Sequence, residues 1–135
     1  MVSAATPRPT RTIEEVLARA RSGLTRLSPA AAAEAVGDGA VLADIRPAAQ
    51  RAAEGGPEGA LVVERNVLEW RFDPASDARL PIADHDLQVI VLCQEGYTSS
   101  LAAAALQELG IWRATDVEGG WAAWRAWAKA GPLRR

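Results

Sequence analysis

The residue with the most distinctive chemistry in this chain is its only cysteine, Cys93. It follows the apolar run LQVIVL at residues 87–92 and begins the loop CQEGYT at residues 93–98, which leads into a helical pattern. A loop that enters a helix presents backbone N–H groups that no helix carbonyl can accept. Those groups and the helix dipole favour an anion, and cysteines at helix N-termini ionise more readily than free thiols. We therefore interpret Cys93 as a candidate thiolate nucleophile.

The neighbouring residues fit this interpretation without requiring it. Gly96 allows the positive φ that a tight loop with inward-facing amides often needs. Thr98, Ser99 and Ser100 could cap the following helix or donate hydroxyl hydrogen bonds to an anion. A single cysteine at a strand end is nevertheless often a small buried apolar residue with no reactivity. The residues alone leave both interpretations open, whereas a phosphate loop is disfavoured because the Gly-Lys-Ser/Thr ending is absent.

Composition narrows the class of protein. The chain has 135 residues, which suits one domain, and its 15 basic and 17 acidic side chains give a net charge of -2. That balance disfavours binding to nucleic acid or to an anionic membrane. One cysteine and one histidine leave no disulfide and no thiolate cluster, so we expect no metal and no cofactor. Neither a membrane-spanning run nor a signal peptide is visible, so we expect a cytoplasmic protein.

Hydrophobic periodicity predicts alternating helices and strands. We expect a flexible N-terminal segment at residues 1–11 and a single domain at residues 12–135. Strands alternating with helices through long crossovers indicate an α/β fold with a mostly parallel sheet. Helices are predicted at 12–24, 28–36, 48–54, 66–72, 99–109 and 120–130, and strands at 40–45, 60–63, 87–92 and 114–117.

Charged residues near the strand ends are the next candidates, because ligand sites of open α/β sheets lie beyond the carboxyl ends of the strands. We expect Asp44 and Arg46 to form an ion pair or backbone hydrogen bonds that fix the loop beside the site. Arg65 is a possible cation for the Cys93 loop, although a solvated arginine is the more common case. Arg21 and Arg26, together with Arg19, are interpreted as a solvated helix face.

Four segments of the chain, in the right order, resemble the rhodanese (sulfurtransferase) family. Residues 42–47, LADIRP, are similar to the family's N-terminal signature, an apolar strand ending Asp-Val/Ile-Arg. Residues 56–60, GPEGA, resemble a degraded form of its His-Ile-Pro-Gly-Ala turn, and the Cys93 loop follows. Residues 117–124, VEGGWAAW, are close to its C-terminal signature. Together the match extends over about residues 24–133.

This resemblance implies a single rhodanese-like domain with a five-stranded parallel sheet flanked by helices on both faces. It implies that Cys93 takes up sulfane sulfur as a persulfide from thiosulfate, mercaptopyruvate or another persulfide. The sulfur would then pass to a thiol or a cyanide-like acceptor. The resemblance also implies substrate contacts with the loop amides and hydroxyls of Gln94, Glu95, Gly96, Tyr97, Thr98 and Ser99.

The loop departs from the family pattern in its charge. Many members carry Arg or Lys inside this loop, whereas Gln94, Glu95 and Thr98 stand here. A solvated carboxylate a few ångströms from a bound dianion repels it by about 1 kcal/mol, so we expect weak thiosulfate turnover. The alternative is a persulfide carrier or interaction module serving a partner protein of sulfur metabolism. Phosphatases of the same fold use a loop one residue longer that ends in Arg; the sixth residue after Cys93 is Ser99, so phosphatase activity is not expected.

Overall fold

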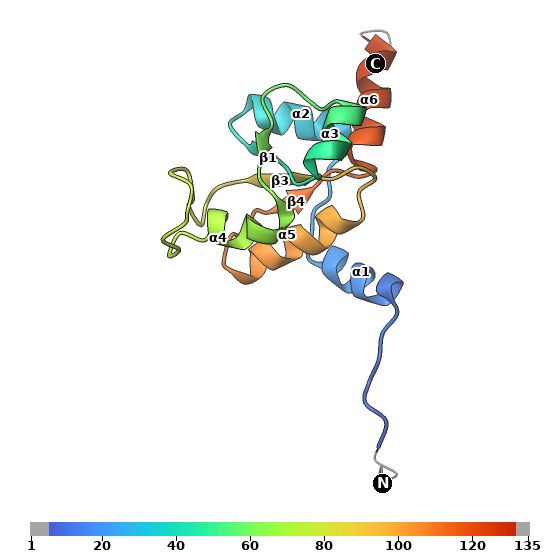
Figure 1. Cartoon of the computed structure of the whole chain (residues 1–135), viewed down its shortest axis with the longest axis vertical. Helices are drawn as coiled ribbons and strands as arrows, with labels where there is room; N and C mark the ends of the chain where they lie inside the picture. Colours follow the sequence, from blue (N-terminus) through green and yellow to red (C-terminus); the bar gives the residue numbers. More distant parts are fainter. Residues whose placement is uncertain (1–5, 132–135) are drawn as a thin grey trace.

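The computed structural model describes residues 6–131 and has the alternating order that the sequence predicts (Figure 1). Residues 1–5, part of the segment predicted to be flexible, and residues 132–135, the end of the predicted domain, lie outside the described residues. The elements in chain order are α1 (Ile13–Ser22), α2 (Pro29–Gly37), β1 (Val41–Asp44), α3 (Ala48–Glu54), β2 (Leu61–Val62), the 3₁₀ helix η1 (Arg65–Val67), α4 (Leu68–Phe72), β3 (Val89–Leu92), α5 (Thr98–Glu108), β4 (Thr115–Asp116) and α6 (Gly120–Ala130).

The sheet is parallel and has the order β2-β1-β3-β4. It has four strands in the described residues, so the prediction of five is wrong. The place of a fifth strand beside β4 is taken by a single parallel bridge between Leu27 and Val117. Only four residues separate the α1 cap, Gly23, from Ser28, which caps α2 ahead of Pro29. Within that linker only Leu27 pairs with the sheet, so it forms a bridge and not a strand.

Helices cover both faces of the sheet, with α2, α3 and α6 on one side and α1, α4 and α5 on the other (Figure 1). Successive side chains of a strand point to opposite faces, and β3 follows this rule. Ile90 and Leu92 pack in the core with Trp121 of α6. Val89, Val91 and then Cys93 pack in the core under α5. The alternation therefore turns the cysteine toward the α5 side of the sheet.

Local sequence signals explain where the first two helices begin. The Thr12 side chain accepts a hydrogen bond from the Glu15 N–H, and the Glu15 carboxylate accepts one from the Thr12 N–H, which completes a capping box. Ser28 caps α2, with Pro29 at its first position. None of the helices in residues 6–131 has the length and apolar character needed to cross a bilayer.

Two glycines bring the start of α6 against the Cys93 loop. Gly96 has φ of 85°, and a Cβ there would lie 2.8 Å from the Gly119 nitrogen. Gly120 has φ of 58°, and a Cβ there would press on the Cys93 carbonyl oxygen and lie 2.8 Å from the Gln94 carbonyl carbon. Both obstacles are backbone atoms, which cannot rotate away. The loop and the helix start can approach this closely only because both positions lack a side chain.

We expect Gly120→Ala to destabilise the protein by roughly 3 kcal/mol, from the left-handed backbone and the contact with the loop together. Gly59→Ala is the matched control, because Gly59 has φ of 78° with open space around its Cα. The control should lose only about 1–2 kcal/mol. Urea unfolding followed by tryptophan fluorescence measures both values. Equal losses at the two positions would contradict the close approach described here.

Candidate active site

Cys93 lies directly beyond the carboxyl end of β3, the central strand next to β1. Cys93 is only 4% exposed to solvent, and it lines a cavity of about 220 Å³. The cavity walls come from the loop itself and from the segment that follows β1, including Ile45 and Pro47. A buried thiol at the wall of an open cavity can be reached by a small molecule, whereas a thiol enclosed in the core cannot.

Two backbone N–H groups of the loop converge on the sulfur atom. The Gly96 N–H donates to Cys93 Sγ at an N–S distance of 3.2 Å, and the Ser99 N–H does so at 3.4 Å. Ser99 lies in the first turn of α5, where N–H groups have no partner within the helix. Two peptide dipoles therefore point their positive ends at the sulfur, an arrangement that favours negative charge there.

The start of α6 holds the opposite side of the loop. The Trp121 N–H donates to the Cys93 carbonyl at 2.8 Å, and the Ala122 N–H donates to the Gln94 carbonyl at 3.0 Å. These donors belong to the first turn of α6 and would otherwise have no partner. The same contact thus satisfies the helix end and turns two loop carbonyls away from the sulfur.

Asp44 and Arg46 form the ion pair that the sequence predicts, and both are buried. The Arg46 guanidinium donates to both carboxylate oxygens of Asp44, at 3.0 and 2.8 Å, and to the Gln94 side-chain oxygen at 3.0 Å. It also stacks over the Trp121 ring, 5.5 Å from its centroid. Its charge is therefore matched by Asp44, and the pair positions the first side chain after the cysteine.

Arg21 and Arg26 do not lie on a solvated helix face, which corrects the sequence interpretation. Both are half-buried and donate to the Gly96 carbonyl, at 2.7 and 2.9 Å. Arg26 also pairs with the fully buried Asp116 of β4. Asp116 in turn accepts hydrogen bonds from the Ser99 and Ser100 hydroxyls, each at 2.7 Å. Asp116 was missed by the sequence analysis; an acidic residue inside the strand predicted at 114–117 is the signal that could have found this cluster, because a buried carboxylate requires such partners.

Arg65, the possible cation for the Cys93 loop, does not contact that loop. Its guanidinium forms an ion pair with Glu69, four residues along, at 2.8 Å. Within residues 6–131 it makes no hydrogen bond or ion pair with the loop. Glu95, Tyr97 and Thr98 are exposed at the loop surface and line the cavity. No group of three or more His, Cys, Asp or Glu side chains in this part of the chain is arranged to hold a metal ion.

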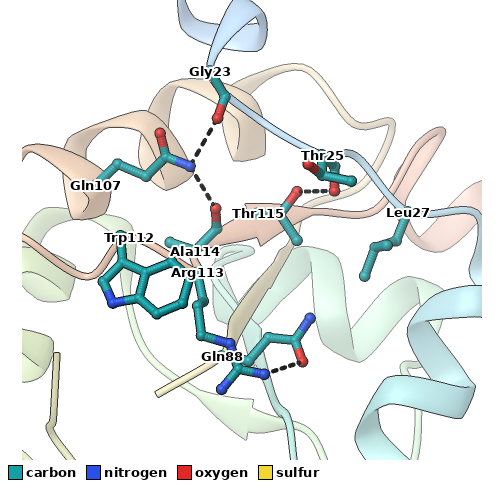
Figure 2. Close-up of a pocket in the computed structure, with 9 residues that line it drawn as sticks. All are labelled: Gly23, Thr25, Leu27, Gln88, Gln107, Trp112, Arg113, Ala114 and Thr115. Atoms are coloured by element: carbon teal, nitrogen blue, oxygen red, sulfur yellow. Dashed lines mark hydrogen bonds between the residues drawn. The ribbon is translucent and has the colours of Figure 1, made fainter. Parts of the chain in front are cut away.

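Another pocket, of about 290 Å³, lies at the opposite end of the strands (Figure 2). Gln88 and Ala114 line it, and these residues precede β3 and β4, whereas Cys93 follows β3. Two of its polar side chains already have partners: Gln107 donates to the Gly23 and Ala114 carbonyls, and Thr115 donates to the Thr25 carbonyl. It contains no nucleophilic thiol, so the chemistry of this protein is better placed in the Cys93 cavity.

Comparisons with known proteins agree with this geometry. No curated protein matches the chain. A structure from Rhodopseudomonas palustris, described as a protein of unknown function and possible tyrosine phosphatase, is 31% identical, with a TM-score of 0.80 over 92% of this chain and 97% of that one.

Two further structures share the fold. A thiosulfate sulfurtransferase from Pseudomonas aeruginosa is 24% identical, with a TM-score of 0.61 over 94% of this chain and 20% of that one. A rhodanese-related protein from Thermoplasma volcanium is 21% identical, with a TM-score of 0.57 over 78% and 92%. The family model for the rhodanese-like domain matches residues 28–126, and the chain therefore belongs to the rhodanese-like domain family.

Proposed function

We propose that this protein is a sulfurtransferase in which Cys93 carries sulfane sulfur as a persulfide. The observation that supports this best is the pair of N–H groups directed at Sγ beside an open cavity. Family membership supports the same reaction class, because the domain is shared with a sulfurtransferase structure. The reducing cytoplasm, where we expect the protein, would keep the thiol available between cycles.

The reaction has two displacement steps. With thiosulfate as donor, the Cys93 thiolate attacks the outer sulfur, the Sγ–S bond forms, and sulfite leaves with the electron pair of the broken S–S bond. An acceptor anion, such as a thiolate or cyanide, then attacks the terminal sulfur of the persulfide. The Sγ–S bond breaks, the electron pair returns to Cys93, and the sulfur leaves bound to the acceptor. Splitting the transfer into two steps is the usual benefit of a covalent nucleophile.

The loop offers donors for the additional sulfur atom. Within residues 6–131 the N–H groups of Gln94, Glu95, Tyr97 and Thr98 donate no hydrogen bond to another protein group. We expect some of them to hold the terminal sulfur once it is bound to Sγ. Fixed peptide dipoles stabilise negative charge without having to reorganise during the reaction.

Phosphatase activity is disfavoured even though one similar structure is described as a possible tyrosine phosphatase. Phosphatase chemistry of this fold needs an arginine at the end of the loop to bind phosphate oxygens. Ser99 occupies that position, and its hydroxyl is bound to Asp116. The nearby Arg21 and Arg26 bind the Gly96 carbonyl and do not line the cavity.

A second candidate function is a persulfide carrier that is loaded and discharged by a partner protein. Glu95 favours this alternative, because an exposed carboxylate at the cavity repels dianions such as thiosulfate. A neutral, carbon-borne or protein-bound sulfur donor would not meet that repulsion. The carrier keeps the persulfide at Cys93 and differs only in lacking rapid turnover with small donors.

The first test is sulfur loading. Wild-type protein treated with thiosulfate, mercaptopyruvate or glutathione persulfide is expected to gain one sulfur atom, removable by cyanide, in intact-mass measurements. Cys93→Ser should gain none and should unfold at nearly the same urea concentration as wild type, because the hydroxyl is close to the thiol in size and can accept hydrogen bonds from the same two N–H groups. Absence of an adduct with every donor would falsify the proposal.

A second measurement separates the enzyme from the carrier. Thiocyanate production from thiosulfate and cyanide is compared with stoichiometric loading by glutathione persulfide. We expect loading to be complete, with slow but measurable thiosulfate turnover. Loading with no turnover for thiosulfate or mercaptopyruvate would select the carrier instead.

The charge of Glu95 should control thiosulfate use. Glu95→Gln is expected to raise kcat/KM for thiosulfate about fivefold at low salt, which corresponds to removing about 1 kcal/mol of repulsion. The gain should shrink as salt screens the exposed charge. Glu108→Gln, the same charge change at the far end of α5, is the control and should have no effect. An equal gain in both variants would show that only net charge matters.

A further inference from the structure

We propose that Arg21 and Arg26 are positioning residues for the Cys93 loop, which they hold in its reactive geometry while supplying the positive charge that the loop itself lacks. The inference rests on the proposed persulfide chemistry and extends it to residues outside the family match, which begins at residue 28. These two arginines come from α1 and from the linker that follows it.

The contact point is the Gly96 carbonyl. It accepts hydrogen bonds from both guanidinium groups, so each lone pair of its oxygen has a charged donor. Charge-assisted hydrogen bonds of this kind are shorter and stronger than neutral ones. The N–H of the same residue, Gly96, donates to Cys93 Sγ. One glycine is therefore held from outside by two cations and bonded on its other side to the sulfur.

The same arginines also fix the second donor to the sulfur. Arg21 donates through Nε to the Ser100 hydroxyl at 3.0 Å. Arg26 binds Asp116, whose carboxylate accepts the Ser99 and Ser100 hydroxyls. These contacts fix the first turn of α5, where the Ser99 N–H points at Sγ. The cluster of Arg21, Arg26 and Asp116 therefore contacts both residues, Gly96 and Ser99, whose N–H groups reach the sulfur.

The charge of the cluster favours an anion in the loop. Two guanidinium groups and one carboxylate leave one positive charge behind the loop, whereas the buried Arg46 is matched by Asp44. Arg21 also lies 5.8 Å from the centroid of the Tyr97 ring, so its charge lies beside the loop. A fixed, half-buried cation acts on nearby charge more strongly than one in water. Both the thiolate and the persulfide anion would gain from it.

The principal variant is Arg21→Gln, because within residues 6–131 Arg21 has no carboxylate partner that its loss would leave unpaired. Its readouts are the rate constant for iodoacetamide alkylation of Cys93 and the rate constant for sulfur loading from glutathione persulfide. We expect both to fall about tenfold, which is less than the roughly hundredfold loss that a 1 Å misplacement of a catalytic group can cause, because the loop keeps its other contacts. In steady-state assays kcat should fall with little change in KM.

Conservative and matched variants separate positioning from simple stability. Arg21→Lys should recover part of the loss, because an ammonium keeps the charge but cannot reproduce the two-pronged contact. Arg19→Gln removes an exposed arginine of the same helix and should react like wild type. Arg26→Gln should repeat the Arg21→Gln result wherever it folds, and circular dichroism and urea unfolding give the folded fraction for each variant.

A merely structural role would lower the urea midpoint while leaving the alkylation rate of folded Arg21→Gln equal to that of wild type, and this outcome overturns the inference. Equal losses in Arg19→Gln and Arg21→Gln would overturn it as well. The alkylation readout needs no sulfur donor. If wild type takes up no sulfur but Arg21→Gln still alkylates slowly, the proposed function fails and the positioning role stands.

Discussion

Four of the six carbonyl groups in the Cys93 loop are held by hydrogen bonds from separate parts of the chain. The N-terminus of α6 takes the carbonyls of Cys93 and Gln94, Arg21 and Arg26 take that of Gly96, and the Ser100 N–H takes that of Tyr97. In a planar trans peptide the N–H points opposite to the carbonyl. Each outward carbonyl therefore leaves an N–H facing the other way, and a loop without basic side chains becomes a cradle for an anion.

These backbone contacts leave no room for a side chain between the loop and the start of α6. The first turn of α6 can reach the Cys93 and Gln94 carbonyls only at backbone contact distance, which excludes a side chain at Gly96 and Gly120. On the other flank, Asp44 and Arg46 hold the Gln94 side chain. The loop is thus fixed by contacts from β1, α6 and the N-terminal segment, while its outer residues remain exposed.

Much of the fold could be predicted from the sequence, because local signals determine it. Thr12 and the Ser28-Pro29 pair mark two helix starts, and the apolar run before Cys93 marks the central strand. The bounds of α3 and α6 match the predicted ranges. The five-strand prediction came from the family resemblance, and it is wrong because the linker before α2 bridges β4 at Leu27 alone.

The site was predictable only in part. Cys93 and the Asp44–Arg46 pair stand at strand ends, which is information carried by neighbouring residues in the sequence. The contact between Arg21 and Gly96 joins residues 75 positions apart, and periodicity says nothing about such a pair. Periodicity placed Arg21 on the solvated side of its helix, but the Arg21 side chain reaches the Gly96 carbonyl of the loop. Arg65 had an equally suitable position in the sequence, yet Glu69 binds it.

The family match begins at residue 28, directly after the single bridge that Leu27 forms with Val117. The segment before residue 28 adds no regular strand to the sheet, and its links to β4 include the two Leu27 backbone bonds, the Thr115 hydroxyl and the Arg26–Asp116 pair. A fragment trimmed to the family limits would keep every strand and lose both arginines. Its Asp116 would then be a buried acid without the Arg26 counterion, and the Cys93 loop of such a fragment would lack both donors to the Gly96 carbonyl.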